Sequence, residues 1–219
     1  MLKQPKILPM TQKEYYNKVI ELFETNLPEA DTELKFSNNF ELLVAVMLSA
    51  QCTDKRINMV TPALFSAYPD AMAMSKATVD DILGYISSVS YPNSKARHLS
   101  EMSQQLVTRF GGEVPSTFDE LTSLPGVGRK TANVVTSHAF GRSCIAVDTH
   151  VFCVSHRLGL VPARCTTPLA TELYLTSRVP TEKQLKFHFY LLEHGKRTCT
   201  LRKAHCDDCF LSTLCKRRL

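Results

Sequence analysis

Four cysteines lie close together near the end of this 219-residue chain, at the spacing C-x6-C-x2-C-x5-C. They are Cys199, Cys206, Cys209 and Cys215. Four thiolates on one short segment can surround a tetrahedral zinc ion or a four-iron cluster. Zinc sites usually pair two close Cys-x2–4-Cys units, whereas here only Cys206 and Cys209 are close. The spacing therefore favours the bulkier iron–sulfur cluster and leaves zinc as the alternative.

A second candidate site lies in the segment LPGVGRK, residues 124–130. Gly126 and Gly128 flank one apolar residue, and glycines allow a backbone with φ > 0 that points successive N–H groups in one direction. A helix is predicted to begin directly afterwards, so the segment offers a backbone site for an anion such as a DNA phosphate. Arg129 adds positive charge beside it. The alternative is an ordinary turn between two helices.

Lys130 stands at this predicted helix N-terminus, although cations are favoured at the opposite end of a helix. Positive surroundings disfavour the ammonium form of a lysine and leave more of the neutral amine, which is the nucleophile. Lys130 is thus a candidate for covalent catalysis. The alternative role is one more phosphate contact.

Asp148 follows a short apolar run and precedes a helical stripe of Val151, Val154 and Leu158. Aspartate is a good helix N-cap, and capping would also fix the direction of its carboxylate. A fixed carboxylate near Lys130 could relay a proton and balance positive charge on a sugar. The structural and the catalytic interpretation are compatible.

The loop between the first two clustered cysteines carries Arg202 and Lys203. Such charges are usually solvated surface residues. The more specific interpretation is that a bound metal holds this loop in place to contact phosphates, since a rigid loop loses less entropy on binding.

The elements that must position these residues are helices, because apolar residues recur at helical spacing along most of the chain. Residues 40–51 are apolar nearly all round, which predicts a helix in the middle of the fold. An apolar stripe runs from Ala96 to Phe110 and should stop at Gly111, and a later helix is expected to end at Gly195. The expected fold is all-α, with about ten short helices.

Composition sets broad limits. The chain carries 44% hydrophobic residues and a formal net charge of +5, with a pI of about 8.8. This mildly basic balance permits a polyanionic partner. The first residues show no apolar signal-peptide region, and no segment is apolar enough to cross a bilayer. We therefore expect a reducing, bacterial-type cytoplasm with association to the nucleoid, and no membrane partner.

Several segments together resemble the endonuclease III family of DNA base-excision glycosylases. They are SAQCTD, NSKA, LPGVGRKTANVV, IAVDTHV and the four-cysteine pattern, and the likeness covers nearly the whole chain. The resemblance implies a helix-hairpin-helix DNA glycosylase fold of two helical domains with a cleft between them. A six-helix barrel would span residues 32–142, with the helix-hairpin-helix at about 118–137. Residues 1–31 and 143–219 would form a discontinuous domain that carries a [4Fe-4S] cluster.

The same resemblance implies an N-glycosylase that removes oxidised pyrimidines from double-stranded DNA, coupled to an AP lyase. Lys130 would form a Schiff base with the sugar, Asp148 would assist, and β-elimination would nick the strand. Gln51 would fill the space left by the flipped base, and Tyr91 would wedge into the stack. The partners would be duplexes with damaged pyrimidines or abasic sites, bound by a monomer.

Two loops depart from the family pattern. Ser90, Tyr91 and Pro92 stand where the pattern has glycine, an apolar residue and an aromatic one, so the turn should change. In the cluster loop, Ala204 and His205 stand where Pro-Arg is familiar, so we expect one phosphate contact to be weaker.

Three other functions fit parts of this pattern. The related adenine-mismatch glycosylase shares the cluster but has serine at the position of Lys130. A non-catalytic helix-hairpin-helix module would not require both Lys130 and Asp148. A zinc-stabilised interaction protein would be colourless, whereas an iron–sulfur protein is yellow-brown.

Overall fold

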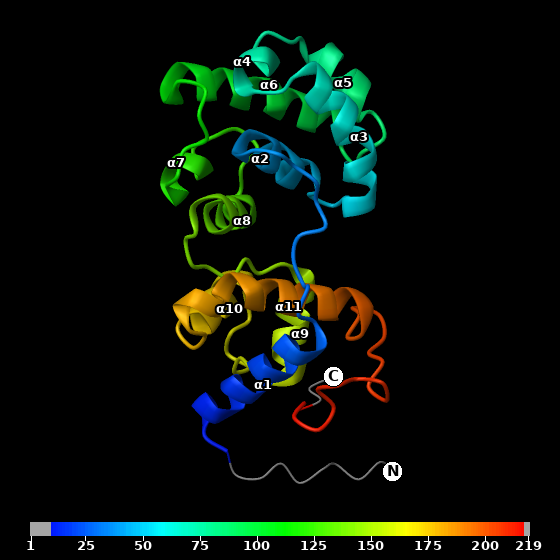
Figure 1. Ribbon diagram of the computed structural model, residues 1–219, viewed down its shortest axis with the longest axis vertical. Helices are drawn as coiled ribbons and strands as arrows, with labels where there is room; N and C mark the ends of the chain where they lie inside the picture. The colour runs from blue at the N-terminus through cyan, green and yellow to red at the C-terminus, as the bar shows by residue number, and fades with distance from the viewer. Residues whose placement is uncertain (1–9, 217–219) are drawn as a thin grey trace. The chain divides into compact units, whose positions relative to one another are not determined.

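The computed structural model describes residues 10–216, which are built from helices (Figure 1). No β-strand forms among these residues, where a single antiparallel bridge pairs Cys199 with Ala204. The predicted all-α class is therefore confirmed. In the described part of the chain, no helix combines the length and the apolar character needed to cross a membrane. Residues 1–9 and 217–219 of the predicted discontinuous domain lie outside the described residues.

The chain divides into two compact units, one spanning Glu33–Arg142 and the other formed by the segments up to Thr32 and from Ser143. The first unit contains α2 (Asn39–Leu48), α3 (Asp54–Ala67), α4 (Ala71–Met74), α5 (Val79–Ile86), α6 (Pro92–Phe110), α7 (Phe118–Thr122) and α8 (Arg129–Phe140). The second contains α1 (Gln12–Asn26), α9 (Thr149–Leu158), α10 (Pro168–Thr176), the 3-10 helix η1 (Thr181–Lys183) and α11 (Gln184–Arg197).

Helix α2 is the centre of the first unit. Every residue from Phe40 to Leu48 is buried, as the uniformly apolar sequence predicts. The side chain of Asn38 caps the helix by accepting a hydrogen bond from the backbone N–H of Glu41, at 2.9 Å. Because no side of α2 is left for solvent, helices pack around it, among them α3, α6 and α8.

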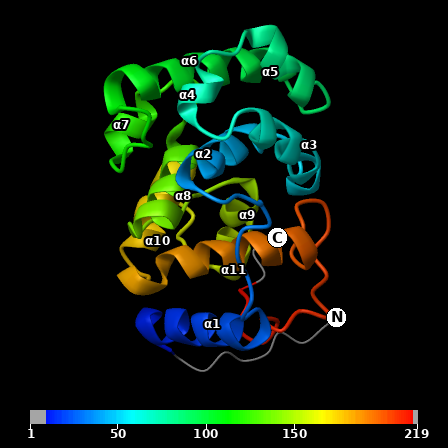
Figure 2. The ribbon, with the colours of Figure 1, turned by 45° about the horizontal axis from the view of Figure 1, so that its top comes forward.

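Helix α6 follows the predicted stripe. Ala96, Leu99, Met102 and Leu106 are buried, and α4 and α5 pack against the helix (Figure 2). The helix ends at Gly111, whose left-handed backbone (φ 63°) suits glycine. The sequence thus predicted both the buried face and the end of α6.

In the second unit, α1 buries a face that includes Phe23, whose ring stacks on that of Tyr190 at 5.4 Å between centroids. Helix α11 corrects one prediction, because it continues to Arg197 and Gly195 lies inside it. A Cβ on Gly195 would lie 2.9 Å from Cβ of His150 on α9. This glycine therefore permits the close contact of α9 and α11 and does not end the helix.

A pair of glycine substitutions tests this packing. We expect Gly195→Ala to lower the free energy of unfolding by about 1–3 kcal/mol, because the added methyl overpacks the contact with α9. Gly84→Ala in α5 should raise it by about 0.5–1 kcal/mol, because alanine favours helix and no described atom lies within 4 Å of the new Cβ. Urea unfolding followed by circular dichroism measures both. A tolerated Gly195→Ala would contradict the proposed contact.

Candidate functional site

The turn between α7 and α8 requires glycine at position 126. Gly126 has φ of +75°, and a Cβ there would lie 2.7 Å from Cε of Met47 and 2.8 Å from Cβ of His98. Both the backbone conformation and the available space therefore exclude a side chain. This turn between α7 and α8, called the hairpin below, packs directly against α2 and α6. Gly126 uses the positive φ that glycine allows.

Gly128 differs from Gly126. Its backbone is extended (φ −87°, ψ 174°), so this glycine does not use the positive φ that its missing side chain allows. A Cβ on Gly128 would meet no described atom within 4 Å, and the residue gives α8 no side-chain cap. The fold does not need glycine here. Because glycine has no side chain, the N-terminus of α8 stays accessible at this residue. This is the end of a helix that binds anions.

Arg129 and Lys130 are the first two residues of α8, and both are exposed. The guanidinium carbon of Arg129 lies 5.0 Å from the ring centroid of Phe118 on α7, a cation–π arrangement that orients the side chain. The hairpin therefore presents two cations next to the open helix N-terminus.

Asp148 is the N-cap of α9 in the other unit. Its Oδ1 accepts a hydrogen bond from the backbone N–H of Val151 at 2.9 Å, and the side chain is half-buried. The predicted capping role is confirmed, and it fixes the carboxylate in one direction. Lys130 and Asp148 belong to different units, and each is positioned by the helix N-terminus of its own unit.

Gln51 and Tyr91 share an unusual backbone. Among residues 10–216 they are the non-glycine residues with positive φ, at 56° and 55°. Such conformations cost about 1–3 kcal/mol each and are commonly found at functional sites. Tyr91 is restricted further because Pro92 follows it. Ser90, at the position of the missing glycine, does not adopt a positive φ, so the left-handed residue of this turn is Tyr91.

The sequence reasoning missed Lys95, which lies in the first turn of α6 and is 9% exposed. Its Nζ donates to the backbone oxygens of Leu48 at 2.8 Å and Ala50 at 2.7 Å, and burial lowers its pKa. A cation at these carbonyls satisfies the C-terminal end of α2. Lys95 precedes Leu99 by four residues, so its place on the buried face of α6 was a signal in the sequence.

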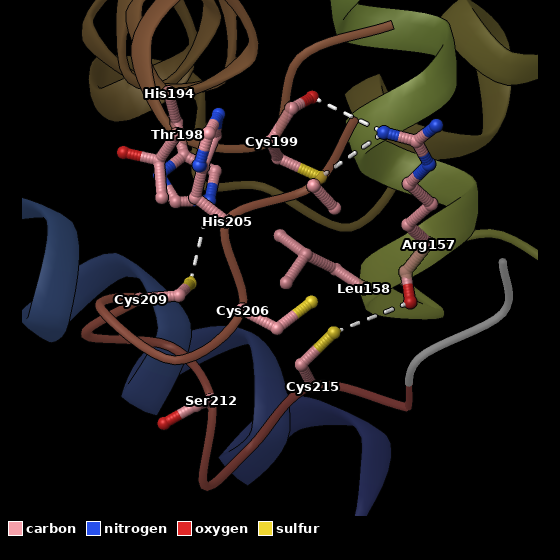
Figure 3. A pocket seen from close by; sticks show the side chains of 11 residues that line it. Arg157, Leu158, His194, Thr198, Cys199, His205, Cys206, Cys209, Ser212 and Cys215 are labelled. Atoms are coloured by element: carbon pink, nitrogen blue, oxygen red, sulfur yellow. Dashed lines mark hydrogen bonds between the residues drawn. The ribbon is translucent and has the colours of Figure 1, made fainter. Parts of the chain in front are cut away.

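The four clustered cysteines line one pocket in the second unit (Figure 3). All four are free thiols. Burial raises the pKa of Cys209, and the neighbouring Cys215, Cys199 and Cys206 raise it further by charge repulsion. A group that carries positive charge is needed to hold such thiols ionised, so the donor set fits a metal centre. Between residues 10 and 216, no three cysteine, histidine, aspartate or glutamate side chains close around a single metal ion.

Two further pocket residues were not predicted. Arg157 donates from Nη1 to Sγ of Cys199 at 3.5 Å and to the backbone oxygen of Thr200 at 2.7 Å, and from Nη2 to that of Leu201 at 3.2 Å. Nε2 of His194 lies 3.7 Å from Sγ of Cys209. Burial lowers the pKa of His194 to about 4, so its ring is neutral at pH 7. Both side chains can donate hydrogen bonds to thiolates.

The loop that carries Arg202 and Lys203 is held at its base. Thr200 Oγ1 donates to the backbone oxygen of Lys203 at 2.6 Å and accepts from its N–H at 3.2 Å. Arg157 binds the carbonyls on the near side of the same loop. Arg202 and Lys203 are exposed, so the loop presents two cations from a fixed base.

Residues 44–181 match the model of a family described as the HhH-GPD superfamily of base excision DNA repair proteins. The matched residues include α7, the turn at Gly126 and α8. More narrowly, the chain belongs to the endonuclease III family of this superfamily and is a base-excision repair enzyme.

Known relatives cover almost the whole chain. The endonuclease III of Rickettsia felis is 41% identical, over 94% of this chain and 95% of the relative. The endonuclease III of Escherichia coli K12 is 41% identical, over 87% and 90%. A solved structure of a trapped endonuclease III–DNA covalent intermediate is 38% identical and superposes with a TM-score of 0.89, covering 95% of this chain and 97% of that one.

The two hairpin glycines should respond differently to alanine. Gly126→Ala is expected to cost about 1–3 kcal/mol of unfolding free energy, because it adds a clash and a strained backbone. Gly128→Ala should leave stability unchanged within about 0.5 kcal/mol, because its backbone is extended and its surroundings are open. Denaturant unfolding compares them. Equal losses of stability in both variants would contradict the assigned difference.

Proposed function

We propose that this protein is a bifunctional enzyme that removes oxidised pyrimidines from duplex DNA and nicks the strand 3′ to the resulting abasic site. The observation that carries the proposal is the position of Lys130 at the N-terminus of α8. The residue before this helix, Gly128, gives it no side-chain cap. The likeness to a relative trapped covalently on DNA supports it. Asp148, fixed by its capping bond, supplies the carboxylate.

The chemistry follows from these groups. The N-terminus of α8 and Arg129 bind a backbone phosphate and so hold the strand without reading its sequence. The damaged nucleotide leaves the stack. Neutral Nζ of Lys130 attacks C1′ of its deoxyribose, the N–C bond forms, and the glycosidic bond breaks with release of the base. The new ammonium on Nζ then loses a proton, O4′ gains one, and the C1′–O4′ bond breaks, which opens the sugar ring and leaves a Schiff base at C1′. This Schiff base permits loss of a proton from C2′ and departure of the 3′ phosphate.

Asp148 has two tasks in this scheme. It accepts the proton that the amine must lose, and its negative charge balances the cationic sugar as the base departs. In the duplex, Gln51 fills the space that the base vacates and Tyr91, 65% exposed, wedges into the stack. Arg202 and Lys203 contact phosphates from their fixed loop.

We propose that Cys199, Cys206, Cys209 and Cys215 hold a [4Fe-4S] cluster. When bound, the cluster would supply a rigid, charged scaffold for the loop of Arg202 and Lys203. Arg157 and His194 would donate hydrogen bonds to its thiolates. The enzyme would act as a monomer on nucleoid DNA in a bacterial cytoplasm.

The catalytic roles of Lys130 and Asp148 are tested by borohydride trapping on a duplex with one thymine glycol. Wild-type protein should give a covalent protein–DNA band, and Lys130→Ala should give none while still binding DNA. Asp148→Asn should fold, because asparagine is also a good N-cap, and should react about 10²–10⁴-fold more slowly. Arg164→Ala, which removes an exposed cation of the second unit, is the control. Trapping of Lys130→Ala at the wild-type rate would overturn the proposal.

The cofactor is tested separately by colour and by iron and sulfide analysis. The purified protein should be yellow-brown and contain equal amounts of iron and acid-labile sulfide. Cys206→Ser should lose both, because a hydroxyl is a poor substitute for a thiolate ligand. Cys52→Ser, in the other unit, should retain both. Colourless protein with one equivalent of zinc would contradict the cluster.

A further inference from the structure

The hydroxyl of Ser90 joins two loops of the first unit that are far apart in sequence. Its Oγ donates a hydrogen bond of 2.7 Å to the backbone oxygen of Gln51, 39 residues earlier. Ser90 directly precedes Tyr91. The bond therefore connects the two segments that hold the left-handed non-glycine residues of the described chain.

Lys95 ties the same segments a second time. Its ammonium binds the carbonyls of Leu48 and Ala50, which lead into Gln51. Its backbone N–H donates to the carbonyl of Tyr91 at 3.1 Å, as part of the first turn of α6. The N-terminus of α6 thus holds both loops, and Ser90 supplies the bond that reaches Gln51 itself.

This arrangement keeps two strained residues in place before any ligand binds. Left-handed backbone at a non-glycine residue persists only where the surroundings determine it. Gln51 and Tyr91 are exposed, so their side chains add little packing that would do so. A preformed pair of loops binds with less loss of conformational entropy than a mobile pair.

We propose that Ser90 is a positioning residue that couples the Gln51 and Tyr91 loops, so that both side chains enter the duplex as one unit. This inference rests on the proposed function, in which Gln51 fills the vacated space and Tyr91 wedges. Ser90 does not touch the reacting atoms. It acts through the backbone of Gln51 and sets the efficiency of opening the duplex.

The test uses single-turnover base removal from a duplex with one thymine glycol. Ser90→Ala should be about two- to tenfold slower than wild type, the effect of one lost hydrogen bond. Ser90→Thr keeps the hydroxyl and should retain the wild-type rate. Ser75→Ala is the matched control, since it also removes a serine bond to a carbonyl, that of Met72 at 2.9 Å, and should have no effect.

Two further measurements separate positioning from general damage. In a Gln51→Ala background, Ser90→Ala should slow base removal less than twofold, because the residue through which it acts is truncated. Borohydride trapping on single-stranded abasic DNA, which has no partner strand to open, should be unchanged by Ser90→Ala.

Three outcomes would overturn the inference. They are a wild-type rate for Ser90→Ala on the duplex, full additivity with Gln51→Ala, and an equal loss on single-stranded DNA. Failure of the proposed function would look different, because the wild-type protein itself would then give no trapped band.

Discussion

The complete burial of α2 is the constraint on which the first unit depends. A helix without an exposed face must be packed on all sides, and the backbone carbonyls at its C-terminal end need donors. Lys95 of α6 supplies such a donor to the backbone carbonyl of Leu48, the last residue of α2. Met47, on α2 itself, sets how closely the hairpin glycine Gly126 can approach. The hairpin that carries Lys130 and the loop that carries Gln51 are thus positioned by the same buried helix.

The two units differ in the charge that their candidate sites favour. The first unit presents two exposed cations at a helix N-terminus, the end of a helix that attracts anions. The second gathers four thiols in a half-buried pocket, where they stay ionised only beside a positively charged group. Arg157 supplies positive charge there, and it donates hydrogen bonds both to Sγ of Cys199 and to the loop that follows it. One side chain therefore connects the cysteine pocket to the exposed pair of Arg202 and Lys203.

Helical periodicity and motif residues were enough to predict the all-α fold, the burial of α2 and α6, and the capping role of Asp148. Gly195 was misread, because sequence does not distinguish a glycine that ends a helix from one that permits contact between two helices. The hydrogen bonds of Ser90, Lys95 and Arg157 were missed for one reason. Each side chain bonds to backbone carbonyls between 39 and 47 residues away, and only tertiary packing brings those carbonyls within reach.

Formation of the covalent bond between Lys130 and DNA is the central step of the proposed mechanism. Its most direct test is peptide mapping by mass spectrometry of wild-type protein reduced with borohydride on an abasic duplex. We expect a deoxyribose-derived adduct confined to the peptide that contains Lys130. An adduct on another lysine or on the N-terminal amine, with Lys130 unmodified, would contradict it.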